Sequence, residues 1–244
     1  MRAAMILASI LGLAACNMAA DAQDRDGPGS NAVTQRGYPL RGFTSISLAG
    51  PHDVVVAVGP AHSLRAEGPS DVLDRLKIEV DGRTLEIGMH KGSWRSDFNA
   101  NRPKTIIHVT IPALEAASIE GSGNMRIDKV EGGRFAASIG GSGDLDIRSL
   151  RVGEASFSVA GSGAIRAAGS RNRSRVSIAG SGDVNLEALE ARTASVSIVG
   201  SGDVRARAMD TAEVSIMGSG DVNLTGSARC SLSKMGSGSV RCGG

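Results

Sequence analysis

The tripeptide Gly-Ser-Gly occurs seven times in the second half of this 244-residue chain. Its first glycines are Gly121, Gly141, Gly161, Gly180, Gly200, Gly218 and Gly236, so successive copies lie 18 to 20 residues apart. One such loop can hold a phosphate group, but self-similarity at a nearly fixed period is typical of an array in which each unit stacks on the next. The repeat therefore favours a solenoid over a nucleotide-binding site.

Side chains within each repeat alternate between apolar and polar. In residues 176–186, VSIAGSGDVNL, the aliphatic residues and both glycines share one face, because successive side chains of a strand point to opposite sides. We predict that this face lines a core, that the glycines turn the chain through a corner without a Cβ, and that the serine points out. A second apolar column, which predicts a second corner, consists of Val130, Leu150, Leu189 and Met209, with Ser170 and Ser227 at the same spacing in the other two repeats.

A single repeat is too small to fold alone. It buries about four large aliphatic side chains at roughly 1.5–3 kcal/mol each, against about 1.5 kcal/mol of ordering entropy for each residue. Stacked coils pair each strand with its neighbours and close the core. We therefore predict an all-β fold, a single-stranded parallel β-helix with coils of about 18–20 residues, right-handed by the usual handedness of crossovers, with an irregular N-terminal cap.

The N-terminal part continues the pattern in weaker form. Residues 50–54, GPHDV, stand where later coils have Gly-Ser-Gly-Asp-Val, which predicts a degenerate first coil. A short helix is expected in residues 70–76, and Asp81-Gly82 is a hairpin turn signal. The predicted organisation is a lipoprotein signal peptide over 1–15, a flexible tether over 16–36, degenerate coils and a cap over 37–117, and regular coils over 118–244, with 37–244 as one continuous domain.

Several of these segments together resemble a known family. They are Phe43-Thr44-Ser45-Ile46, Asp53-Val54, the hairpin VDGRTLEI and the Ser-Ile-x-Gly-Ser-Gly-Asp-Val coils. Over residues 40–240 the chain resembles the bacterial cell-envelope family called head GIN domain, or putative auto-transporter adhesin. The resemblance implies a β-helical fold and export to the envelope, and it carries no catalytic or binding residues onto this chain.

The N-terminus is typical of an export signal. Arg2 precedes an apolar run over residues 3–15 that is too short to span a bilayer. The run ends in Leu13-Ala14-Ala15-Cys16, which resembles the lipobox of bacterial lipoproteins, so Cys16 is predicted to carry a lipid. The alternative is cleavage after Ala20-Asp21-Ala22, which would discard Cys16. We expect a membrane-anchored protein of the bacterial envelope, on the periplasmic or surface face of the outer membrane.

Composition and the placement of polar residues argue against catalysis. A net charge of +2 and 2% aromatic residues supply neither the basic field nor the stacking platforms that nucleic acids need. Export removes the chain from ATP and NAD(P)H, so no cofactor is predicted. A serine nucleophile needs a base beside it, and the four histidines, His52, His62, His90 and His108, all precede the regular coils. We expect a non-catalytic binding, adhesion or structural module whose partner is an envelope protein or polysaccharide; a β-helix polysaccharide-processing enzyme is the alternative.

An acidic column follows the corners. Asp144, Asp183, Asp203 and Asp221 each come directly after Gly-Ser-Gly and would stack at about 4.8 Å between coils. Stacked carboxylates can collect Ca²⁺, which prefers six to eight oxygen ligands. Arginines two residues further on, among them Arg166, Arg205 and Arg241, can instead neutralise them. We interpret the column as turn capping and surface pairing, with a calcium-stabilised assembly as the alternative.

Two further features stand out. Cys230 and Cys242 flank the last Gly-Ser-Gly with inward parity, which predicts a disulfide, and free buried thiols are the alternative. Lys234 takes an aliphatic position in that coil, where its charge would discourage another strand from adding. The polar segment 90–105 holds a candidate partner contact, because exposed aromatic and arginine residues are common interface anchors: Trp94, Arg95, Phe98 and Arg102. Alternatively, Trp94 folds back to cover the core of the first coil.

Overall fold

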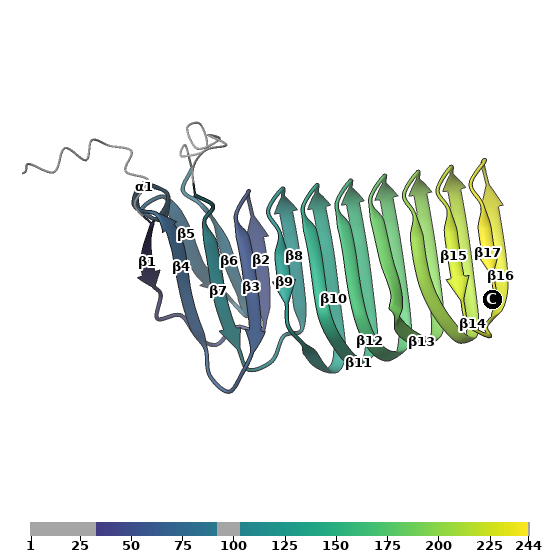
Figure 1. The fold of residues 1–244 in the computed structure, drawn as a ribbon, viewed down its shortest axis with the longest axis horizontal. Helices are drawn as coiled ribbons and strands as arrows, with labels where there is room; N and C mark the ends of the chain where they lie inside the picture. Colours follow the sequence, from purple (N-terminus) through teal and green to yellow (C-terminus); the bar gives the residue numbers. More distant parts are fainter. Residues whose placement is uncertain (1–32, 92–102, 244) are drawn as a thin grey trace, which may run out of the picture.

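The structure is a computed structural model that describes residues 33–91 and 103–243 (Figure 1). Cys16 and the candidate contact formed by Trp94, Arg95, Phe98 and Arg102 lie outside these described residues. None of the described residues forms a helix with the length and apolar character needed to cross a membrane.

The strands in the described ranges belong to one 17-stranded sheet with two parts. The C-terminal part is a β-solenoid of about six turns, which stack along the long axis of the molecule (Figure 1). Its strands are β8 (Ala116–Gly121), β9 (Met125–Ile127), β10 (Val130–Gly141), β11 (Asp144–Gly161), β12 (Ala164–Gly180), β13 (Asp183–Gly200), β14 (Val204–Gly218), β15 (Val222–Thr225), β16 (Arg229–Met235) and β17 (Val240–Cys242).

The N-terminal part is a curled mixed sheet. Its elements are β1 (Val33–Gly37), β2 (Ser45–Ala49), β3 (Asp53–Val58), β4 (Ser63–Pro69), α1 (Ser70–Leu73), β5 (Leu76–Asp81), β6 (Thr84–Met89) and β7 (Ile106–Ile111). The predicted hairpin is confirmed as the antiparallel pair β5–β6, and the predicted short helix is α1.

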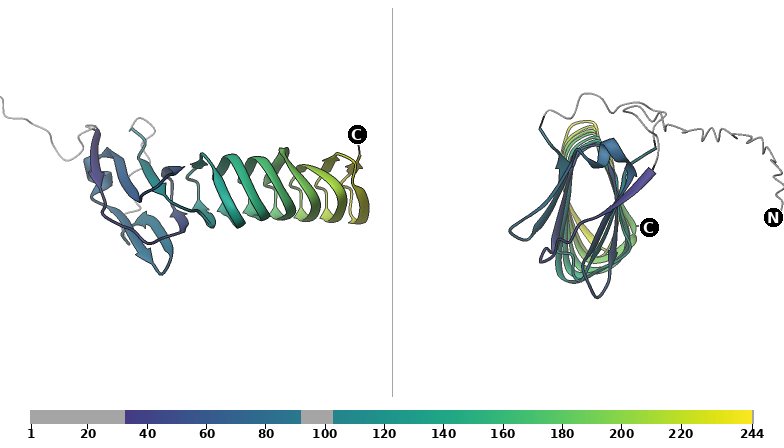
Figure 2. Two further views of the ribbon diagram at one scale, coloured as in Figure 1. Left: turned by 90° about the horizontal axis from the view of Figure 1, so that it is seen from below. Right: turned by 90° about the vertical axis from the view of Figure 1, so that its left-hand side faces the viewer.

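Neighbouring coils pair in parallel and in register. Ile139 lies opposite Val159, Val159 opposite Ile178, and Ile178 opposite Ile198, so one coil takes 19 or 20 residues here. The end-on view in Figure 2 shows a flattened tube with two facing layers. The parallel β-solenoid predicted from the repeat is therefore confirmed.

The alternation within each coil places the core as expected. Val176, Ile178, Val184 and Leu186 are each at most 1% exposed, and the same columns are buried in the neighbouring coils. Every coil contributes a few aliphatic side chains to one continuous interior. The stability of a coil therefore comes mainly from its packing against the neighbouring coils.

The second corner needs correction in two coils. Met209 does not lie opposite Leu189, because the pairing shifts between Leu186 and Glu190. The structure places Gly169, and not Ser170, opposite Leu150 and Leu189. The coil that begins at Gly161 is one residue shorter than those beside it, and the pairing shifts between Ile147 and Leu150 to absorb the difference. Counting nine residues from the first glycine therefore misses the column in this coil.

The degenerate first coil predicted at residues 50–54 is confirmed. β2 and β3 pair in parallel with β8 and β9, with Leu48 opposite Ile119 and Val54 opposite Met125. The Gly50 N–H donates to Glu120 O at 2.8 Å, so this corner stacks on the first Gly-Ser-Gly corner. β1 pairs antiparallel with β4, so the last residues of the segment predicted as a tether belong to the sheet.

The last coil leaves the C-terminal end of the core open. A disulfide joins Cys230 to Cys242, whose Cα atoms lie 6.6 Å apart, and so links β16 to β17. Leu232 occupies an inward column but is 53% exposed. The ammonium of Lys234, in the next inward column, donates to Gly238 O at 2.8 Å.

Candidate binding groove

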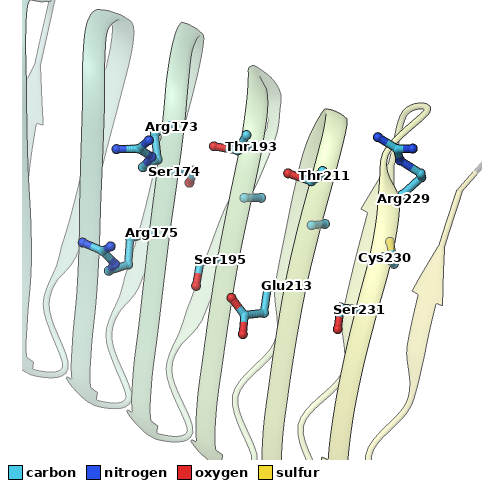
Figure 3. Close-up of a pocket in the computed structure, with 12 residues that line it drawn as sticks. Arg173, Ser174, Arg175, Thr193, Ser195, Thr211, Glu213, Arg229, Cys230 and Ser231 are labelled. Atoms are coloured by element: carbon cyan, nitrogen blue, oxygen red, sulfur yellow. The ribbon is translucent and has the colours of Figure 1, made fainter.

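A polar groove crosses four coils on one outer face of the solenoid (Figure 3). Its volume is about 510 Å³, and β12, β13, β14 and β16 each contribute three consecutive residues to it. The outward-facing lining consists of Arg173, Arg175, Thr193, Ser195, Thr211, Glu213, Arg229 and Ser231, above a floor of Ser174, Ala194, Ala212 and Cys230. These twelve residues are called the polar groove below.

The register of the coils arranges the outward side chains in two rows. In the first row, Arg173 lies opposite Thr193, Thr193 opposite Thr211, and Thr211 opposite Arg229. The second row runs in the same way through Arg175, Ser195, Glu213 and Ser231. Each step between coils is about 4.8 Å, so the two arginines of the first row are held roughly 14 Å apart with two threonines between them.

Two cations of the groove have no acidic partner among the described residues. Arg175 lies 3.8 Å from Glu154, which also contacts Arg134. Arg173 and Arg229 make no such ion pair in the described part of the chain. Glu213, the one carboxylate in the lining, lies in the other row. Glu154 lies opposite Arg173 in the adjoining coil, but its ion pairs are with Arg134 and Arg175. The first row is therefore a hydroxyl-lined track with a cation at each end that makes no ion pair of its own.

Two smaller hollows extend the groove around the second corner of the coils. One is lined by Arg134, Asn172 and Arg192 among others, and it shares Arg173 and Thr193 with the polar groove. The other includes Arg151 and Arg171. Arg134 and Arg192 are paired, Arg192 with Asp210 at 3.5 Å, whereas Arg151, Arg171 and Arg173 make no ion pair among the described residues. Unpaired positive charge is therefore present both at the two ends of the first row and at this corner.

The aspartate column caps neighbouring coils. Oδ1 of Asp183 accepts from the Asp203 N–H at 3.1 Å, and Oδ1 of Asp203 accepts from the Asp221 N–H at 3.0 Å. Two coils before Asp183, Oδ1 of Asp144 likewise accepts from the Ala164 N–H, but Ala164 has no side-chain acceptor, and the Asp183 N–H donates to Gly163 O instead. These bonds join each coil to the next at the point where the backbone pairing is interrupted by the corner.

The arginines beside this column neutralise the aspartates less than the sequence indicated. Arg166 approaches Asp144 only to 3.9 Å. Two hydrogen bonds from Ser239, led by its backbone N–H, lower the pKa of Asp221, and the charge of Arg241 has a smaller effect in the same direction. No cluster of three or more potential metal ligands occurs in the described ranges. The geometry favours capping, and the calcium hypothesis stays untested.

The residues of the polar groove were not among those predicted to form a site. Arg173, Thr193, Thr211 and Arg229 follow the first glycine of their coils by 11 to 13 residues. This drift in spacing hides the column until the coils are aligned by strand register. A comparison of outward positions coil by coil would have found it.

Arg171 is a second residue that the sequence patterns did not single out. It lies on the inward face of β12, between Val152 and Ala191 of the adjoining coils, and is 5% exposed. Its guanidinium carbon lies 5.5 Å from the centre of the Phe157 ring. Arg171 lies two residues after the inward-facing Gly169, and this spacing predicts an inward side chain. Arginine is so rarely buried, however, that a surface position is the ordinary expectation for it.

Fold and groove together define a parallel β-solenoid with a polar groove on one outer face. The chain belongs to the family described as putative auto-transporter adhesin, head GIN domain, which matches residues 42–228. This description implies a cell-surface or envelope protein. A search of curated proteins finds no match to the chain.

Solved structures show the same fold. One from Bacteroides fragilis NCTC 9343, described as a putative adhesin, gives a TM-score of 0.80 at 24% identity and covers 87% of this chain and 98% of that one. One from Parabacteroides distasonis ATCC 8503, described as a putative lipid binding protein, gives 0.71 at 26% identity, with 88% and 98% covered. A putative adhesin from Parabacteroides merdae ATCC 43184 gives 0.67 at 16% identity, with 88% and 97% covered.

Proposed function

We propose that this chain is a non-catalytic binding module of the bacterial envelope and that its polar groove holds a linear acidic polysaccharide. The observation that carries the proposal is the first row of the groove, in which Arg173 and Arg229 stand without acidic partners at either end of two threonines. A carboxylate- or sulfate-bearing sugar chain would supply both the missing negative charge and the hydroxyl groups that threonine and serine can bond.

The shape and chemistry of the groove favour a polysaccharide over a folded protein. Protein interfaces usually centre on an apolar, aromatic-rich core, whereas the lining of the polar groove contains arginine, threonine, serine and one glutamate above small floor residues. Weak contacts repeated coil after coil suit a repeating polymer, because several weak sites on one chain combine into useful affinity.

The hydroxyl groups of the groove support binding and not catalysis. Activation of a serine or threonine requires a base within hydrogen-bonding distance, and the lining of the groove contains no histidine. Glu213, its only carboxylate, is exposed. A β-helix hydrolase or lyase would need a cluster of acids and bases on one coil face. Loss of activity on an envelope polysaccharide in Glu213→Gln would favour the enzyme instead.

The proposal includes export and anchoring through a lipid on Cys16. A lipid at this residue and a short tether would hold the N-terminal sheet near the membrane and leave the solenoid to project from it. Labelled palmitate should be incorporated by the full chain and not by Cys16→Ser. Equal labelling of both would exclude the anchor and leave the groove proposal intact.

Affinity electrophoresis through gels that contain alginate or dextran tests the groove. Alginate is a linear acidic polysaccharide and dextran a neutral one, so the protein should be retarded by alginate alone, and less so as salt rises. The double variant Arg173→Gln/Arg229→Gln should abolish the retardation, whereas Glu213→Gln should strengthen it.

The matched control is Arg205→Gln, which removes an equally exposed cation in the coil whose corner begins at Gly200 but outside the polar groove. This variant should migrate in alginate as the unmodified protein does. Retardation that is equal in alginate and dextran, or that is lost equally in Arg205→Gln, would contradict the proposed ligand.

A second candidate function is contact with lipid. Val199, Met217 and Met235 lie opposite one another in successive coils and are 54%, 56% and 70% exposed, which forms an apolar column at the C-terminal end. The relative from Parabacteroides distasonis described as lipid binding adds weight to this candidate. Flotation with phosphatidylglycerol vesicles that is lost in Met217→Glu would support it.

A further inference from the structure

Arg171 carries a charge into the interior of the solenoid without a partner from the protein. Its Nε, Nη1 and Nη2 atoms are all buried, and none has a hydrogen-bond partner among the described residues. A guanidinium has five N–H groups to satisfy. The Phe157 ring beside it offers the attraction of its face but accepts no conventional hydrogen bond.

The charge of Arg171 is not balanced from within the core. The other polar side chains that are buried in the described part of the chain are His52, Thr105 and Ser174, and none of these is a carboxylate. Burial lowers the pKa of Arg171 to about 9, which still leaves the guanidinium protonated at neutral pH. An unpaired charge in a low-dielectric interior is strongly unfavourable, so an ion from solution is the available counter-charge.

The surroundings of Arg171 suit a small anion. Ser174 faces the same interior three residues further along β12, is 1% exposed, and its hydroxyl also has no hydrogen-bond partner among the described residues. The inward positions of the next two coils around this corner are alanines: Ala191, Ala194, Ala208 and Ala212. The guanidinium and one hydroxyl are therefore the donors; the following coils present short side chains to them, and Val152 and the Phe157 ring lie beside Arg171 on the other side.

We propose that the solenoid binds one small monovalent anion, of the size and charge of chloride or bromide, between the Arg171 guanidinium and the Ser174 hydroxyl. A singly charged, weakly hydrated ion is favoured because a phosphate or sulfate would bring a second charge that nothing in the core neutralises. Arg171 also lines the hollow that contains Arg151, whose charge makes no ion pair among the described residues and raises the local concentration of anions at this corner. The site shares Ser174 with the floor of the polar groove, but it lies on the core side of that floor and does not depend on the proposed polysaccharide.

Thermal unfolding of the full chain in sodium bromide and in sodium gluconate of equal ionic strength tests the proposal. Gluconate is a much larger anion than bromide and is not expected to enter the core. A ligand that binds only the folded state stabilises it in proportion to its occupancy, and we expect the Tm of the unmodified protein to be roughly 5 °C higher in bromide than in gluconate. Arg171→Met should show no difference between the two salts, and Ser174→Ala should show a reduced one.

Arg173→Met is the matched control, because it removes an arginine two residues away whose side chain lies outside the core. This variant should retain the full bromide effect. An equal Tm of the unmodified protein in both salts, or a bromide effect that survives in Arg171→Met, would overturn the site.

Anomalous diffraction from crystals of the unmodified protein grown in bromide gives a reading that does not depend on how the variants fold. A bromide peak within about 3.5 Å of the Arg171 nitrogens is expected, since this is the contact range of a charge-assisted hydrogen bond to a halide larger than oxygen. Ordered water at that place, with bromide only on the outer surface, would refute the proposal.

Discussion

Each Gly-Ser-Gly corner stacks directly on the corner of the preceding coil. At Gly200, φ is +133°, and an added Cβ would lie 2.1 Å from Gly180 O. The turn alone would favour glycine, but the contact between coils makes any side chain impossible without separating them. One substitution here acts on two coils at once.

Gly200→Ala should therefore destabilise the fold by roughly 2–5 kcal/mol, the combined cost of backbone strain and overpacking. Urea unfolding measures this change in the free energy of unfolding. Gly133→Ala is the control in the same solenoid, because an added Cβ there meets nothing within 4 Å. It should leave stability unchanged or slightly increased, and equal losses in both variants would contradict the stacking explanation.

Arg171 predicts an unusual response to alkaline pH. Burial lowers its pKa in the folded state to about 9, well below the ordinary value that it regains on unfolding. Above that pH the unfolded chain binds one more proton than the folded chain, so stability rises with pH.

The free energy of unfolding of the unmodified protein, minus that of Arg171→Met, should therefore increase from roughly pH 8 to 11. At neutral pH and without a small anion, Arg171→Met should be the more stable of the two, by about 1–4 kcal/mol. Urea titrations of both proteins in gluconate at each pH supply the difference. A difference that stays constant with pH would show that the guanidinium is not buried.

Residue type alone could not place either site. Arg171 shares the inward parity of Ile165 and Gly169 in its own coil, but the pairing with the neighbouring coils shifts at this corner, so columns counted along the sequence do not line up there. Arg173 and Arg229 lie in one row although they follow the first glycine of their coils at different spacings, so strand register is again needed to align them. The disulfide and the outward serines follow from simple alternation, so they could be predicted from the sequence directly.

At the scale of strands, the aspartate ladder closes the corners that backbone pairing leaves open. Asp203 bonds to both neighbouring coils: its Oδ1 accepts from the Asp221 N–H, and its own N–H donates to Oδ1 of Asp183. Replacement of its side chain removes the acceptor and leaves the next N–H to solvent.

Asp203→Ala should cost about 1 kcal/mol, the net value of one hydrogen bond. Asp203→Asn keeps an oxygen at the same place and should cost less. Chemical denaturation of both variants tests this order. Repetition of the measurement with Ca²⁺ also tests the calcium alternative, which requires the metal to stabilise the unmodified protein and not Asp203→Asn.

The strands that could be predicted are those with a buried face. The solenoid strands alternate strictly, and the β5–β6 hairpin has its turn signal at Asp81-Gly82. β1 could not be found in this way, because all five of its residues are exposed and it is held to β4 by backbone pairing. A strand without an apolar face has no hydrophobic period to detect.

At the scale of the molecule, the solenoid is a series of nearly equivalent units, each in contact with its two neighbours (Figure 1). Deletion of residues 181–200 removes one whole coil and joins Gly180 to Ser201, so that the repeat continues across the junction. The remaining coils can stack as before, because each interface joins equivalent columns.

This deletion variant should fold, with an unchanged circular dichroism spectrum per residue and a Tm a few degrees lower. It also brings Arg173 and Arg229 closer by about 4.8 Å and removes Thr193, so retardation by alginate should fall. Deletion of residues 186–195, half a coil, is the control and should prevent folding. The corner residues of the later coils would then lie opposite strand residues of the earlier coils, and the buried columns could not align. If the variant that lacks residues 181–200 is retarded by alginate as strongly as the unmodified protein, the groove is not where the polysaccharide binds.

The hydrogen bonds between coils run along the long axis of the solenoid, so a pull on its two ends loads every junction in series. The junction with the fewest paired residues then yields first, and here it is the last one, where β17 pairs with β15 over three residues. The disulfide between Cys230 and Cys242 lies in that coil. It ties the two arms together, so that under tension the end of the protein must detach as a closed loop instead of unravelling residue by residue.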